Sequence, residues 1–150
     1  PYTVAYAAIT SNTSGATAET VWVTSGAVTF ENGRAYRVTL KALIQPVSGG
    51  SVNDKVTLRV RKTDASGSVY LDTFHQGGQV VGSNTLIYAS NVCTNTSGSD
   101  VTATALVGTF QRSNGSTSNV LVAASSTHTA YIEVQDIGPA SDYSTATAIT

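Results

Sequence analysis

Acidic side chains are the first candidates for chemistry in this chain, and they are sparse. A glycosidase needs two positioned carboxylates, usually beside aromatic rings that hold the sugar. Asp72 and Glu133 both fall within predicted strands, but no feature of their spacing supports such a pair. We interpret them as solvated strand residues or as cross-strand partners of arginines. The carboxylates are Glu19, Glu31, Asp54, Asp64, Asp72, Asp100, Glu133, Asp136 and Asp142.

Histidine and cysteine chemistry is no better supported. His75 and His128 are the only imidazoles, and no HxH, HExxH or CxxC motif occurs, so we predict no metal site. GxSxG and the glycine-rich phosphate loops are absent, and Asn53-Asp54 is too little for calcium. The single cysteine, Cys93, is interpreted as a buried thiol. We predict no catalytic residue, no cofactor and no enzyme activity.

Basic residues are concentrated between Arg34 and Phe74, and only Arg112 lies elsewhere. Polyanion binding is one interpretation, but the aromatic interleaving of a single-strand binder is missing. A net charge of −1 also gives no overall field to attract nucleic acid or an anionic membrane. We expect these residues to lie together on adjacent strands, solvating a sheet face or pairing with acidic groups of a neighbouring subunit. They are Arg37, Lys41, Arg59, Arg61 and Lys62.

Three Asn-x-Ser triplets match the glycosylation pattern, but matches arise easily in a chain so rich in Ser and Thr. They begin at Asn12, Asn95 and Asn114, and we interpret them as loop composition. We see no signal peptide and no apolar stretch of the ~20 residues that a membrane span needs. The expected site of synthesis is therefore a host cytoplasm.

Period-two alternation predicts the elements that would position these residues. The clearest run is Tyr36, Val38, Leu40, Ala42 and Ile44, which Pro46 ends. The runs 56–60 and 69–74 flank a Gly-containing turn and predict a β-hairpin, and 130–134 predicts a late strand. We expect the runs within 34–74 to form one three-stranded framework with its Lys and Arg side chains outward. Replacing Arg59 by Ala would then leave folding almost intact.

Smaller signals complete this picture. Asn32-Gly33 favours a type I′ hairpin turn, and Gly108 suggests a bulge or a close backbone contact. Val21 and Val23 are expected on one strand face, with Trp22 on the other. No segment shows the 3.6-residue stripe of a helix.

The fold predicted from these strands is all-β: a jelly-roll-like antiparallel sandwich of about eight to ten short strands. An immunoglobulin-like sandwich is less favoured, because the Cys…Trp…Cys hallmark is absent and Trp22 comes too early. We expect residues 1–138 to form a single domain with a short N-terminal arm. Residues 139–150 are expected to be an extended polar tail.

Three runs carry a resemblance to a known group of proteins. They are AYIEVQDIGP (130–139), ENGRAYRVTLKALI (31–44) and VTLRVRKTDASGSVYLDT (56–73). They resemble virion structural domains of tailed phages that infect actinobacteria, found in minor capsid, decoration and minor tail proteins. The resemblance implies a virion structural role without catalysis, association into a homotrimer, and a terminal arm lying against a neighbour.

Three functions therefore compete at this point. The leading one is a capsid decoration protein that binds major capsid or tail proteins on the virion surface. The second is a minor tail or tail-fibre domain that binds a host receptor or a surface glycan, with an exposed Tyr70, Tyr88 or Trp22 lining a shallow groove. The third is an enzyme acting on cell-wall polysaccharide through Asp72 and Glu133.

Overall fold

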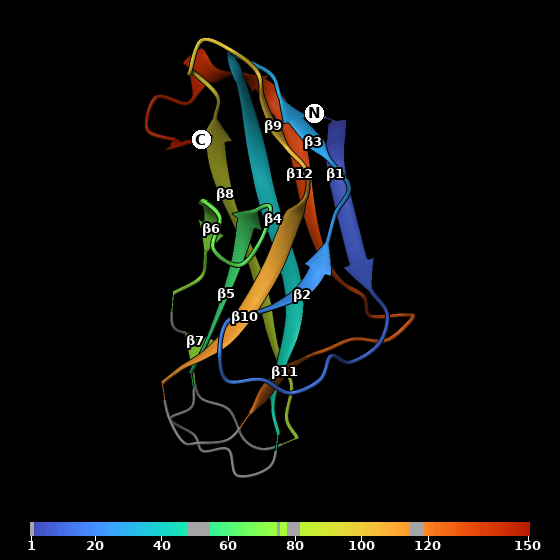
Figure 1. Ribbon diagram of the computed structural model, residues 1–150. Helices are drawn as coiled ribbons and strands as arrows, with labels where there is room; N and C mark the ends of the chain where they lie inside the picture. The colour runs from blue at the N-terminus through green and yellow to red at the C-terminus, as the bar shows by residue number, and fades with distance from the viewer. Residues whose placement is uncertain (1, 48–54, 75, 78–81, 115–118) are drawn as a thin grey trace.

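The structure is a computed structural model that describes residues 2–47, 55–74, 76–77, 82–114 and 119–150. Strands make up almost all of its regular structure, and they form two facing layers (Figure 1). The helical part of the described chain is one short 3₁₀ turn, η1 (Ala140–Asp142). The predicted all-β class and the sandwich are confirmed.

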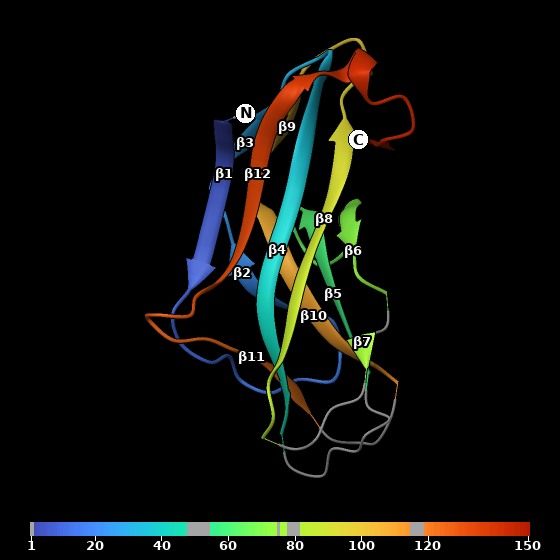
Figure 2. The ribbon, with the colours of Figure 1, turned by 180° about the vertical axis from the view of Figure 1, so that it is seen from behind.

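The first sheet has the strand order β1-β12-β4-β8-β13, and β11 pairs with the far end of β4. Its pairings are antiparallel except that of β13 with β8. Figure 2 shows this sheet from its outer side, with β4 lying between β12 and β8. Its strands are β1 (Tyr2–Ile9), β4 (Arg34–Pro46), β8 (Thr85–Thr94), β11 (Val120–Ala123), β12 (Ala130–Pro139) and β13 (Thr147–Ala148).

The second sheet has the order β2-β10-β5-β6, with β7 beside β5. A separate small pair of strands, β3 and β9, also belongs to the fold. The strands of these two groups are β2 (Thr20–Thr24), β3 (Val28–Phe30), β5 (Lys55–Lys62), β6 (Val69–Asp72), β7 (Gln76–Gly77), β9 (Val101–Ala103) and β10 (Leu106–Asn114).

The main strands form a nested set of antiparallel pairs. β1 pairs with β12, β2 with β10, β4 with β8 and β5 with β6. In chain order, from the outermost pair (β1 with β12) to the innermost (β5 with β6), the pairs belong alternately to the first and the second sheet. A ribbon rolled up in this way is a jelly roll, so the predicted jelly-roll character is confirmed.

The inward faces of the two sheets make the core. Tyr36, Val38, Leu40, Ala42 and Ile44 are all at most 1% exposed, which is what their alternation predicted. The corresponding residues of β5 and β12 are also buried. An aromatic cluster lies in the same core, where the Phe30 ring meets Tyr36 at 5.0 Å and Tyr70 at 5.5 Å, both edge to face.

One prediction about β2 is wrong for an identifiable reason. The pairing of β2 with β10 shifts register between Gly108 and Thr109, so Trp22 is the extra residue of a bulge. Trp22 and Val23 therefore both point into the core, each 6% exposed. A Cβ atom at Gly108 would lie 2.8 Å from atoms of both side chains, so the close contact predicted at this glycine is confirmed.

The stretch 34–74 does not form one three-stranded framework. β4 belongs to the first sheet, whereas β5 and β6 form the predicted hairpin in the second. Asn32-Gly33 is likewise not a hairpin turn, because β3 pairs with β9 while β4 pairs with β12 and β8. Gly33 has a positive φ, as predicted, with a value of 79°, but the backbone N–H groups of Asn32 and Gly33 donate to Asp100 and Asn95 in a different loop.

The last residues are not a loose polar tail. β12 ends at Pro139, η1 follows, and β13 pairs in parallel with Cys93 and Thr94 of β8. Ile149 is 3% exposed and belongs to the core cluster. The polar composition of this segment gave no sign of its packing, because one buried isoleucine is enough to hold a short segment in place.

Candidate interaction surface

The carboxylates considered for glycosidase chemistry are not brought together. Asp72 lies on β6 in the second sheet, where Arg59 donates to it at 3.2 Å. Glu133 lies on β12 in the first sheet and accepts a hydrogen bond from Thr3 at 3.0 Å. Each carboxylate has its own partner in a different sheet, so the structure offers no support for a catalytic pair.

The other candidates are equally separate. His75 and Asn53-Asp54 lie outside the described residues, and His128 closes a tight turn with Ser125. No three His, Cys, Asp or Glu side chains gather as metal ligands within the described ranges. Cys93 is fully buried and donates to the Tyr70 carbonyl at 3.3 Å; burial raises the pKa of its thiol to about 12. The predicted buried thiol is confirmed.

The Asn95 triplet is a structural element of a loop. Asn95 is fully buried and donates through Nδ2 to the carbonyls of Phe30 at 2.7 Å and Ser99 at 2.8 Å. Asn12 is exposed, and its side-chain oxygen accepts the backbone N–H of Ala124. The triplet at Asn114 extends into residues outside the described part of the chain.

The predicted basic patch is wrong, because its members divide between the two sheets. Arg37 and Lys41 lie on β4, whereas Arg59 and Arg61 lie on β5 in the opposite layer. Lys62 ends β5 and donates to the Thr150 carbonyl at 3.0 Å. The prediction placed strands that are consecutive along the chain in one sheet. In the jelly roll, such strands lie in alternate sheets.

The outer surface of the second sheet carries a cluster of ion pairs, which we call the salt-bridge face. Arg59 donates to Glu19 at 3.0 Å and to Asp72 at 3.2 Å. Arg61 donates to the same Glu19 at 2.7 Å. The residues of the salt-bridge face are Glu19, Arg59, Arg61, Asp72, Thr109 and Gln111.

Glu19 is the centre of this cluster. Its burial opposes ionisation, but hydrogen bonds from Arg61 and Thr109 and the nearby arginine charges outweigh that effect and lower the pKa of Glu19. The acidic partners of these arginines therefore come from the same chain. This replaces the expectation that a neighbouring subunit supplies them.

The outer surface of the first sheet is different, and we call it the tyrosine face. Tyr131 on β12, Lys41 on β4 and Tyr88 on β8 stand in one cross-strand row. The Tyr6 ring lies 5.6 Å from the Tyr131 ring, and Lys41 Nζ lies 5.9 Å from the centroid of that ring. The residues of the tyrosine face are Tyr6, Lys41, Leu86, Tyr88 and Tyr131.

The tyrosine face is open to solvent. Tyr6 is 54% exposed, Leu86 52% and Tyr88 65%. Burial, followed by the neighbouring Tyr88, raises the pKa of the half-buried Tyr131, so its hydroxyl stays neutral. The face therefore combines apolar ring surface with phenol hydroxyl groups and one lysine side chain.

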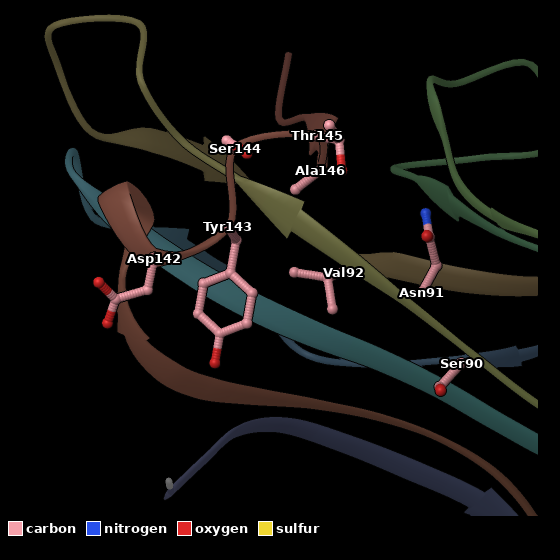
Figure 3. A pocket seen from close by; sticks show the side chains of 8 residues that line it. All are labelled: Ser90, Asn91, Val92, Asp142, Tyr143, Ser144, Thr145 and Ala146. Atoms are coloured by element: carbon pink, nitrogen blue, oxygen red, sulfur yellow. The ribbon is translucent and has the colours of Figure 1, made fainter.

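A polar pocket of about 540 Å³ borders this face along β8. Ser90, Asn91 and Val92 form one wall, and residues 142–146 form the other, with the Tyr143 ring beside Val92 (Figure 3). The Tyr143 hydroxyl donates to the Ile137 carbonyl at 3.4 Å. Among the described residues that line the pocket, Asp142 is the only carboxylate.

The sequence pattern of the run 130–139 reflects a clamp at the end of β12, by which we mean the buried Asp136 carboxylate and the hydrogen-bond donors that hold it. Asp136 is 1% exposed, and Arg34 donates to it twice, at 3.0 and 2.6 Å. The Gly138 N–H binds the same carboxylate at 3.0 Å, and Gly138 has a φ of +124° at a register shift of β12. Hydrogen bonding to Arg34 outweighs burial and lowers the pKa of Asp136.

No protein-family model matches the chain, and no curated protein matches it in sequence. Among solved structures, the chain is similar over 92% of its length to a chain of the infectious bursal disease virus Gt strain, with 11% identity and a TM-score of 0.46. A chain of the infectious bursal disease virus VP2 subviral particle is similar over the same share, with 10% identity and a TM-score of 0.44. This chain spans 34% and 37% of their respective lengths. Neither likeness places it in a family.

Sequence reasoning identified one ring of the tyrosine face. Tyr88 is exposed as the receptor hypothesis required, but Tyr70 is 1% exposed and Trp22 6%, so neither lines a surface groove. Tyr6 and Tyr131 were missed because they come from opposite ends of the chain and meet through the pairing of β1 with β12. Within the described residues, no helix is long and apolar enough to cross a membrane.

Proposed function

We propose that this protein is a non-enzymatic structural component of a virion, a capsid decoration protein that docks on the particle through its tyrosine face. The resemblance of its runs 31–44, 56–73 and 130–139 to tailed-phage virion domains supports this role. Jelly rolls build many viral shells, but the same fold also serves other functions, so we infer the role from the surface of the protein.

The difference between the two outer faces is the observation that carries the proposal. The arginines and carboxylates of the salt-bridge face already bind one another. The tyrosine face leaves Tyr6, Leu86 and Tyr88 more than half exposed. Tyrosines are enriched at protein interfaces and among the residues that dominate binding energy. The tyrosine face is thus the surface suited to a protein partner.

The proposed partners are the major capsid or tail proteins and further copies of this chain, associated as a homotrimer. The proposed location is the virion surface, after synthesis in the host cytoplasm. A net charge of −1 and few charged residues favour contacts made by apolar and neutral polar groups over contacts with nucleic acid.

Particle composition and particle binding test the proposal together. Mass spectrometry of purified particles should find the chain as a stoichiometric component, and the purified protein should co-sediment with particles assembled without it. The double substitution Tyr6→Ser and Tyr88→Ser should weaken that binding by about tenfold or more. Val21→Ser on the second sheet is the matched control, because Val21 is also exposed, at 38%. Absence from particles, or equal binding by all three proteins, would overturn the proposal.

A minor tail or tail-fibre domain that binds a host receptor or a surface carbohydrate is the second candidate. The row of Tyr131, Lys41 and Tyr88 favours it, because flat rings beside hydroxyl and ammonium groups suit the apolar and polar faces of a sugar. The polar pocket beside Ser90 adds hydrogen-bonding groups. Binding on a glycan array that disappears in Tyr88→Ser would support this candidate, whereas an array without signal would count against it.

A further inference from the structure

One side of β8 is paired with β4 along its whole length, whereas within the described residues β13 alone pairs with the other side. β4 pairs with β8 without a register shift, from Thr85 opposite Ile44 to Thr94 opposite Ala35. On the opposite side, β13 covers only Cys93 and Thr94. No strand in the described part of the chain pairs with residues 86–92 on that side.

The hydrogen bonds at the end of β8 show which residues face the open side. The Asn95 N–H binds the Arg34 carbonyl of β4, whereas the Thr94 carbonyl binds the Ile149 N–H beyond β13. Backbone groups of a regular strand alternate in direction along an antiparallel ladder. Even-numbered residues therefore turn their N–H and C=O groups away from β4. Leu86, Tyr88 and Ser90 are such residues, and all three are exposed.

This edge lacks the devices that usually prevent strand addition. From Thr85 to Thr94 it has no charged residue, no proline and no bulge. The pairing with β13 shows that the same edge accepts a strand. The edges of the second sheet are less suitable, because β2 is short and bulged and β6 is short and ends at Asp72.

β1 lies at the other end of the same sheet and has complementary properties. Its eight residues, Tyr2–Ile9, are uncharged, and among the described strands it pairs only with β12. Successive antiparallel pairings from β1 through β12 and β4 leave β1 antiparallel to β8. If a second copy lies beside β8 with its strands oriented as in the first copy, its β1 runs antiparallel to that β8.

We propose that β1 of a second copy of this chain pairs antiparallel with the open edge of β8 at residues 86–90. This deepens the self-association included in the proposed function and rests on that part of it. Because β1 and β8 lie at opposite ends of the sheet, the contact is head-to-tail and a closed ring is its finite form. The joined sheets carry Tyr6 of one copy beside the Leu86 and Tyr88 edge of the next, so the tyrosine face becomes continuous.

Residue-resolved hydrogen exchange of the purified protein without particles, at low and high concentration, tests this contact. Amides of Leu86, Tyr88 and Ser90 should gain protection at high concentration, together with alternate amides of β1. Ile87 and Ala89, whose amides face β4, should be protected at both concentrations. Exchange that does not depend on concentration would overturn the proposal. Protection of β8 with β1 unchanged would also overturn it, because another segment would then occupy the edge.

A pair of variants separates edge pairing from docking by the face. Ser90→Lys places a charge on the open edge, at a residue outside the tyrosine face, and should weaken self-association by about tenfold or more. Gln135→Lys is the matched control, since Gln135 lies in β12, a strand paired on both sides, and it should associate normally. Equal association of both variants contradicts the edge contact. Particle binding measured on the monomeric variant reports separately on the proposed function.

Discussion

The two outer faces of the sandwich arise from the same alternation of residues and differ in how they satisfy their polar groups. On the second sheet, Arg59 and Arg61 meet Glu19 and Asp72 of their own chain. On the first sheet, Tyr6, Leu86 and Tyr88 stand more than half exposed. The comparison shows that basic residues close together in the sequence need not form one surface of the fold. The surface available to a partner is the one whose side chains the chain itself leaves uncovered.

The largest loss of stability is expected from substitutions in the core beneath the two faces, and the loss should be similar under each face. Leu40 lies under the tyrosine face and Leu58 under the salt-bridge face, and both are fully buried. Replacing either by Ala should lower the free energy of unfolding by about 2–5 kcal/mol, because each leaves a cavity. Urea denaturation measures both. A large loss in only one variant would mean that the sheets do not share one core.

The salt-bridge face should contribute to stability in a way that the tyrosine face does not. Glu19→Gln removes the charge that Arg59 and Arg61 share and should lower the free energy of unfolding by roughly 1–3 kcal/mol. Glu133→Gln on the first sheet is the control, and its change should stay within about 0.5 kcal/mol. Equal losses in the two variants would remove the energetic distinction between the faces. Arg59→Ala should also destabilise the fold, because Arg59 pairs with Glu19 and Asp72, whereas the sequence alone predicted that folding would stay almost intact.

Acid stability should reflect the clamp at the end of β12. The pKa of Asp136 is lowered in the folded state, so the unfolded chain takes up this proton first as the pH falls. The stabilisation is complete above about pH 5 and is lost as the pH falls through the folded pKa. In Asp136→Asn, the free energy of unfolding should be lower at neutral pH and should fall less steeply below about pH 5. A wild-type slope in the variant would show that Asp136 does not provide this linkage.

The smallest effect on stability is expected on the tyrosine face. Tyr88→Ser should change the free energy of unfolding by no more than about 0.5 kcal/mol, because the side chain is 65% exposed. Thermal and urea unfolding would measure this. A loss comparable to that of Glu19→Gln would show that Tyr88 supports the fold and is not held for a partner.

Sequence patterns predicted the structural features that depend on residues close together along the chain. Alternation identified the inward faces of β4, β5 and β12, the hairpin of β5 with β6, and the close contact at Gly108. A jelly roll could be predicted because many short strands separated by turns have few other ways to bury one face each.

Features that depend on pairing between strands far apart in the chain could not be predicted from the sequence. The register shift that turns Trp22 inward depends on β10, a distant partner of β2. The assignment of β4 and β5 to different sheets could not be predicted, because both strands show the same alternation. The tyrosine face combines residues from four strands, so it exists only after β1, β12, β4 and β8 have paired.

Radical footprinting of the protein, free and bound to purified particles, is the most direct test of the central claim that one face is kept for a partner. The oxidation of Tyr6, Leu86 and Tyr88 should fall on binding, while Val21 on the second sheet should react as in the free protein. Protection of Val21 with unchanged reactivity at Tyr6 and Tyr88 would contradict the account, because the protein would then dock through the face that its own ion pairs occupy.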